Sequence, residues 1–141
     1  MSSIPLFTAN TNPDKHVPLN KQLSLVVWNI FKGHKPHSWE HLSGFHARAD
    51  FIALQEMVFH PGTEYDFYTR HPETYWSRGT SFVYPKTGLH TGTALATDYH
   101  TSDTYFHVSD VREPFIKTPK SSIAQTYPLV DRNEELLIAH V

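Results

Sequence analysis

The sequence contains no cysteine among its 141 residues. That absence excludes disulfide bonds, zinc ribbons and catalysis by a thiol together. The sequence also lacks an excess of charge of either sign, because 12 Lys and Arg stand against 14 Asp and Glu and give a formal net charge of −2. No global basic field therefore draws the chain to nucleic acid or to an anionic membrane.

Long hydrophobic runs are missing as well. No segment approaches the roughly 18 apolar residues that a membrane span needs, and residues 1–21 show no basic stretch followed by an apolar one, as a signal peptide would. A glycine-rich phosphate loop and a G-x-S-x-G nucleophile motif are also absent. We therefore expect a soluble, cytoplasmic protein without a membrane span, and the sequence leaves its oligomeric state open.

The residues that are present are typical of a folded domain. Apolar residues make up 39% of the chain, and its three Trp, seven Tyr and nine Phe can fill a core. Eleven histidines stand out, because around pH 6, below their ordinary pKa of about 6.5, they would make the chain net positive. Residues 1–21 are polar with scattered proline and asparagine, and we predict an irregular leader there.

A βαβ unit is predicted next. Residues 23–30 form a nearly continuous apolar run, which favours a strand that is buried on both faces. Residues 50–56 form a second such run, so the two strands should be parallel with a right-handed crossover. Ser38 is a candidate N-cap for a helix between them that reaches about Ala49. At helical spacing, the following side chains share one face of the predicted helix: Trp39, Leu42, Phe45, His46 and Ala49.

The rest of the chain predicts a meander of short strands. β-rich runs occupy residues 75–84, 91–97, 104–108, 123–129 and 135–141, and turn residues fill 85–88 and 131–134. The fold class is therefore α/β, a βαβ start followed by mostly antiparallel strands. The last run is an apolar strand with no polar tail, and an unmatched edge of that kind is prone to aggregate. We accordingly expect residues 22–141 to be a partial domain, truncated at its C-terminus.

Two polar side chains end the strands of the βαβ unit. Asn29 closes the first apolar run and Glu56 closes the second. Parallel strands present their carboxyl ends at one edge of a sheet, where open α/β proteins place ligands. A carboxylate beside an amide oxygen suits a hard cation such as Mg²⁺, Mn²⁺ or Ca²⁺. From spacing alone, a strand-ending Asn and a solvated Glu are the competing interpretation.

The residues around this pair resemble a known family. Val27-Trp28-Asn29-Ile30 and, after the helix, Ala49-Asp50 leading to Leu54-Gln55-Glu56 resemble the two opening motifs of the endonuclease/exonuclease/phosphatase superfamily. The run Thr91 to Thr97 is similar to its G-x-A-I-L strand, and Leu136 to Val141 is similar to the start of its L-x-V-x-N-T-H strand. The superfamily includes deoxyribonucleases, inositol polyphosphate 5-phosphatases and bacterial sphingomyelinases.

The resemblance implies the N-terminal half of a two-sheet α/β sandwich and divalent-metal-dependent hydrolysis of a phosphoester. Glu56 would be the principal metal-binding carboxylate, and Asn29 a metal-site residue that orients the ion or its water. The cation, Mg²⁺ or else Mn²⁺ or Ca²⁺, would polarise the phosphoryl oxygen while an activated water attacks in line. Nucleic acid, a small phosphoester and a lipid headgroup all stay open as the substrate.

The sequence also departs from the family. The histidine of the N-T-H strand, and the D-x-N pair and closing D-H that follow that strand, have no counterpart here, and His140 falls where the family usually has Asn. No catalytic role is therefore carried onto His140. We expect this chain alone to be inactive, and a non-catalytic or vestigial binding fragment is the alternative function.

A zinc peptidase is a third, weaker possibility. His37, Glu40 and His41 match the H-x-x-E-H pattern of inverted zinc peptidases, and Glu113 is a conceivable further ligand. The two histidines lie opposite the apolar stripe of the predicted helix, where a helix meets water, so a solvated face is favoured. Lys32 and the basic stretch 117–120 could contact phosphate or simply stay solvated.

Overall fold

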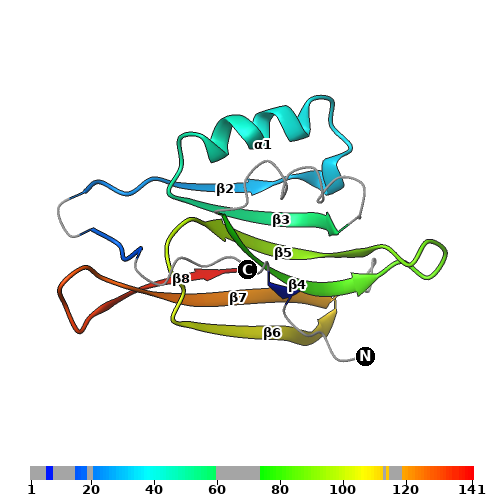
Figure 1. The fold of residues 1–141 in the computed structure, drawn as a ribbon. Helices are drawn as coiled ribbons and strands as arrows, with labels where there is room; N and C mark the ends of the chain where they lie inside the picture. The colour runs from blue at the N-terminus through cyan, green and yellow to red at the C-terminus, as the bar shows by residue number, and fades with distance from the viewer. Residues whose placement is uncertain (1–5, 8–14, 19–20, 60–73, 113, 115–118) are drawn as a thin grey trace.

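The computed structural model describes residues 6–7, 15–18, 21–59, 74–112, 114 and 119–141. They form two β-sheets and one α-helix (Figure 1). The larger sheet has five strands in the order β1-β4-β5-β3-β2, and the smaller has the order β6-β7-β8. The elements are β1 (Leu6–Phe7), β2 (Leu25–Asn29), a 3-10 turn η1 (Phe31–Gly33), α1 (Ser38–His46), β3 (Phe51–Phe59), β4 (Tyr75–Val83), β5 (His90–Thr97), β6 (Asp103–Arg112), β7 (Pro119–Pro128) and β8 (Glu135–His140).

The predicted fold class is confirmed. β2 and β3 are parallel and joined through α1, and every other named strand pair is antiparallel. The predicted strand runs all become strands, with ends that move by a few residues. The predicted turns form at 85–88 and 131–134, where Gly88 (φ 70°) and Asp131 (φ 58°) take left-handed backbone conformations.

The strand β3 has a core on each of its faces, because neighbouring side chains of a strand point to opposite sides. On one face, Ile52 and Leu54 belong to a buried cluster that also contains Trp76. The helix α1 covers this cluster and contributes Leu42 to it. On the other face, Ala53 packs with a second cluster that joins the two sheets: Leu95 and Ile123, with Phe106 and Ile138 beside them. The sheet is therefore the middle layer between a helix and a second sheet.

The helix packs through the face that its spacing predicts. Leu42 is fully buried, and Trp39, Phe45 and Ala49 pack against the same cluster. Ser38, however, is not the N-cap. His37 holds that position with a left-handed backbone and no side-chain cap, while the Ser38 hydroxyl donates to the Lys35 carbonyl at 2.7 Å. The helix ends at His46, three residues before the predicted end.

One expectation about the N-terminal region is wrong, the one for the first strand. β2 is the edge strand of its sheet, so it is not buried on both faces: Leu25 is 50% exposed and Val27 is 59% exposed. An apolar run has the same sequence pattern whether or not a neighbour covers it. The described residues of the segment 1–21 include two short pairings: residues 6–7 pair with β4, and Val17, which is buried, bridges to Leu129.

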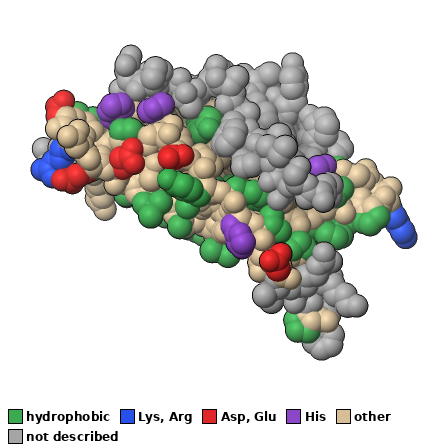
Figure 2. Space-filling model, turned by 90° about the horizontal axis from the view of Figure 1, so that it is seen from below, with side chains coloured by type: hydrophobic (Ala, Val, Ile, Leu, Met, Phe, Trp, Pro, Cys, Tyr) green, Lys and Arg blue, Asp and Glu red, His purple; other side chains and the backbone are tan. Residues whose placement is uncertain are grey.

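Figure 2 shows the face seen from below the view of Figure 1. Hydrophobic side chains run across it, with acidic and histidine side chains among them, and the Lys and Arg side chains coloured there lie at its two ends. Tyr105 and Leu137, on the smaller sheet, are among the exposed large hydrophobic residues. The described side chains of this face thus form no basic patch, in keeping with the near-neutral charge of the chain.

Candidate functional site

Asn29 and Glu56 meet at one edge of the larger sheet. Asn29 is the last residue of β2 and lies opposite Gln55 in the parallel register. Its amide nitrogen Nδ2 donates to Glu56 Oε1 at 3.2 Å. The structure therefore brings the two residues together as parallel strand ends require. Their role in metal binding stays a prediction.

A β-bulge turns Glu56 toward this edge. The register of β3 with β5 shifts between Leu54 and Met57, and Glu56 has a left-handed backbone with φ of 50°. Leu54 and Met57 both belong to the helix-side cluster, although strict alternation would place residues three apart on opposite faces. The bulge inserts the extra residue and aims Glu56 away from the helix-side core. No glycine or proline marks it in the sequence.

A tight turn after β2 places a lysine against the same carboxylate. Phe31, Lys32 and Gly33 all have positive φ, at 50°, 57° and 72°. The Phe31 amide donates to Asn29 Oδ1 at 3.0 Å, which fixes the Asn29 amide with its nitrogen toward Glu56. Lys32 Nζ lies 3.3 Å from Glu56 Oε2. The sequence marks Lys32 only as a residue that could contact phosphate or stay solvated, and gives no sign of this ion pair.

The charges in the site stabilise one another. Burial opposes ionisation of Glu56, but hydrogen bonds from Asn29 and Lys32, with the nearby charge of Lys120, hold its pKa below the ordinary value. Burial likewise opposes the charge on Lys32, and the bond to Glu56 outweighs it and raises the Lys32 pKa. The pair is therefore ionised at neutral pH.

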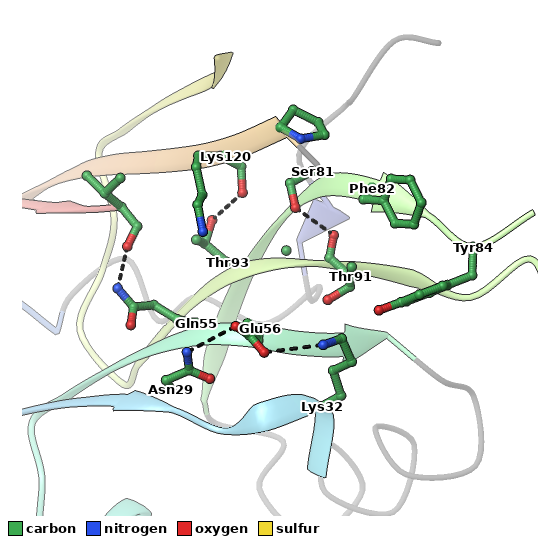
Figure 3. A pocket seen from close by; sticks show the side chains of 14 residues that line it. Asn29, Lys32, Gln55, Glu56, Ser81, Phe82, Tyr84, Thr91, Thr93 and Lys120 are labelled. Atoms are coloured by element: carbon green, nitrogen blue, oxygen red, sulfur yellow. Dashed lines mark hydrogen bonds and ion pairs between the residues drawn. The ribbon is translucent and has the colours of Figure 1, made fainter. Parts of the chain in front are cut away.

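These residues line a cavity of about 250 Å³ (Figure 3). Asn29, Lys32 and Glu56 form one side, and Lys120 and Thr93 lie across from them. Phe82 and Tyr84 add an aromatic wall, and their ring centroids lie 5.1 Å apart in an edge-to-face arrangement. Of the basic stretch 117–120, Pro119 and Lys120 line the cavity, and residues 117 and 118 lie outside the described part of the chain. Among the described residues, the side chains that line the cavity thus include the Glu56 carboxylate, two ammonium groups and several hydroxyls.

The end of β8 fastens the bulged strand. Gln55 Nε2 donates to the Val141 carbonyl at 2.6 Å, and His140 Nε2 lies 2.8 Å from the Leu54 carbonyl, to which it donates. His140 is only 5% exposed. The sequence left His140 without a role, and in the structure its ring bonds to the backbone two residues before Glu56.

The buried His140 is expected to make the folded chain less stable in acid. Burial lowers its pKa, although the hydrogen bond to Leu54 favours the protonated form. The unfolded chain therefore binds a proton first as pH falls below about 6.5, and unfolding becomes easier. The free energy of unfolding can be measured by urea denaturation at pH 7.5 and at pH 5.5. Between these two values we expect the native chain to lose about 1 kcal/mol more of it than His140→Gln, whose amide can still donate to Leu54. His107→Gln, at an exposed position, is the control. Equal losses in all three proteins would contradict a buried neutral His140.

The zinc alternative finds no support in the structure. His37 Nδ1 and Glu40 Oε2 lie 2.9 Å apart on side chains that are 67% and 78% exposed, and His41 is exposed too. Within the described residues, no three His, Asp or Glu side chains gather as a metal site would require. Glu113, the conceivable further ligand, lies outside those residues. The solvated helix face, the favoured interpretation, fits these positions.

The donor set at Glu56 fits a Mg²⁺-like cation in part. One carboxylate can be enough protein ligand for Mg²⁺, which keeps several waters and binds substrate phosphates. Both ends of the Asn29 amide are engaged, because its nitrogen donates to Glu56 and its oxygen accepts from the Phe31 amide, so Asn29 holds Glu56 in place. Glu56 is thus the candidate ligand and Asn29 the residue that orients it.

The arrangement of the layers places the chain in a class of folds. A βαβ unit, antiparallel strands on the larger sheet and a second sheet against its face form a two-sheet α/β sandwich. A solved structure with this arrangement is the endonuclease/exonuclease/phosphatase from Beutenbergia cavernae DSM 12333, with a TM-score of 0.59 and 15% sequence identity. The similarity covers 84% of this chain and 37% of that chain. At this identity the likeness establishes the fold, and the predicted resemblance is confirmed at that level.

No protein-family model matches the chain, and no curated protein matches it. In the described residues, no helix is long and apolar enough to cross a membrane.

Proposed function

We propose that this chain carries part of the site of a divalent-metal-dependent phosphoester hydrolase. The observation that supports the proposal most is the hydrogen-bonded pair of Asn29 and Glu56, at the carboxyl ends of parallel strands and at the wall of a cavity. The fold, shared with an endonuclease/exonuclease/phosphatase structure, agrees with it. The chain spans 37% of that structure's length, so the activity of a whole enzyme is part of the proposal.

In this proposal three of the residues that line the cavity have defined roles. Glu56 holds the cation, Mg²⁺ or else Mn²⁺ or Ca²⁺, and Asn29 keeps the carboxylate aimed at it. When bound, the cation supplies electrostatic stabilisation of the phosphoryl oxygen and the leaving oxygen. Lys120, across the cavity, contributes positive charge that favours a phosphate group.

The residues for the remaining steps have no counterpart in this sequence. The resemblance implies a histidine followed by Asp-Asn and Asp-His pairs for proton transfer and phosphate binding, and this sequence does not contain them in that order. We therefore propose that this chain binds a cation but turns over slowly or not at all by itself. The second candidate function, a binding fragment without turnover, differs from the first only in that last point. The cytoplasmic location and the substrate class stay predictions.

Calorimetric titration with Mn²⁺ tests the proposal. We expect one binding event per chain that Glu56→Gln removes, because the carboxylate is the only charged ligand at the site that this proposal assigns. Glu40→Gln is the matched control, since Glu40 sits on the exposed face of α1 and should leave the titration unchanged. Equal binding by Glu56→Gln and the native chain would refute the site.

A rate measurement separates the two candidate functions. Bis(4-nitrophenyl) phosphate serves as a generic phosphodiester, assayed with and without Mn²⁺. Cation-dependent hydrolysis that Glu56→Gln abolishes would favour the enzyme, and cation binding without hydrolysis would favour the binding fragment.

A further inference from the structure

Both oxygens of the Glu56 carboxylate already have partners. Oε1 accepts from Asn29 at 3.2 Å, and Oε2 lies 3.3 Å from the Lys32 ammonium. The Asn29 amide is neutral and can stay in place when a cation binds. Lys32 is different, because its positive charge already compensates the carboxylate that a divalent cation would use.

The local structure holds Lys32 in that position. It lies in the middle of three residues with positive φ, a turn that folds the chain back toward Glu56. Its ammonium sits 5.4 Å from the centre of the Phe31 ring, within range of a cation–π interaction. The Lys32 side chain is only 23% exposed. A lysine on a solvated loop would have none of these constraints.

We propose that Lys32 is an internal cation that competes with the divalent metal ion for Glu56. This inference rests on the proposed function, because it concerns the same carboxylate. A divalent cation on this carboxylate would be repelled by an ammonium group that lies 3.3 Å from one of its oxygens. The metal ion must therefore displace the ammonium, and the affinity of the site for the ion is lower than the carboxylate alone would give. Without the ion, Lys32 keeps the charge of Glu56 compensated.

The test compares three substitutions by calorimetric titration with Mn²⁺ alone. Lys32→Met should bind Mn²⁺ about fivefold more tightly than the native chain, a gain of about 1 kcal/mol. Lys32→Arg keeps the charge and should show no such gain. Lys35→Met is the matched control, because Lys35 stands 5.5 Å from the same Phe31 ring but is exposed. It removes the same charge from the neighbourhood and should change affinity less than twofold.

Circular dichroism of each variant confirms that the fold is kept. Mn²⁺ binding by Lys32→Met that is equal to or weaker than that of the native chain would overturn the competition, and so would a gain of the same size in Lys35→Met. Failure of the inference is distinguishable from failure of the proposed function. In the first case Glu56→Gln still abolishes binding, and in the second it does not.

Discussion

Replacing Gly92 by alanine is expected to lower the free energy of unfolding by about 3 kcal/mol, the upper end of the usual cost of overpacking. A Cβ atom at Gly92 would lie 1.8 Å from the backbone oxygen of Gly79, on the neighbouring strand β4. That atom belongs to the main chain and cannot rotate away as a side chain would. The strands β4 and β5 must therefore separate where they form a wall of the cavity.

Urea denaturation followed by tryptophan fluorescence measures the effect. Gly44→Ala is the matched control, because Gly44 lies in α1 and its added Cβ would meet only the end of the Arg48 side chain, at 3.7 Å. Alanine favours a helix over glycine by up to about 1 kcal/mol, so this control should gain stability. A loss below about 1 kcal/mol in Gly92→Ala would show that the two strands adjust more easily than this backbone contact allows.

Gly79→Ala should destabilise the chain for a different reason. Its Cβ would lie 1.7 Å from Cε2 of Phe106, whose ring packs between the two sheets. We expect a loss of about 2 kcal/mol, because the ring must leave its position against the bare backbone of β4. Phe106 belongs to β6, so Gly79 determines how closely the smaller sheet approaches the larger one.

A double-mutant cycle identifies the contact. Phe106→Leu removes the ring atoms that the new methyl group would meet, so Gly79→Ala should cost at least about 1 kcal/mol less in that background than in the native chain. Additive losses would mean that the clash with Phe106 is not the cause.

Much of the fold was predictable from the sequence, because it depends on local patterns. The apolar runs, the turns and the helix face follow from side-chain spacing, and the meeting of Asn29 with Glu56 follows from the rule for parallel strand ends. The edge position of β2 was not predictable, because an apolar run has the same pattern with or without a neighbour. The contacts of Gly79 and Gly92 are made with other strands, so the residues next to them in the sequence do not indicate these contacts.

Two features of the candidate site were also beyond the sequence. The turn that brings Lys32 to Glu56 contains one glycine, while Phe31 and Lys32 take their left-handed conformations without any residue type that favours them. The bulge at Glu56 likewise contains no turn residue. Both depend on hydrogen bonds with their surroundings. The Phe31 amide donates to the Asn29 side chain, and the Gln55 side chain donates to Val141 at the end of β8.

The left-handed backbone of Glu56 makes that position a trade-off. For a residue other than glycine this conformation costs roughly 1 kcal/mol, so the carboxylate is displayed at the expense of the stability of the whole chain. Glycine at 56 would relieve the strain and remove the acidic side chain that the described residues contribute to the cavity. The same substitution would also lose the contacts that Asn29 and Lys32 make with the carboxylate, so any gain in backbone stability at this position comes with the loss of the candidate site.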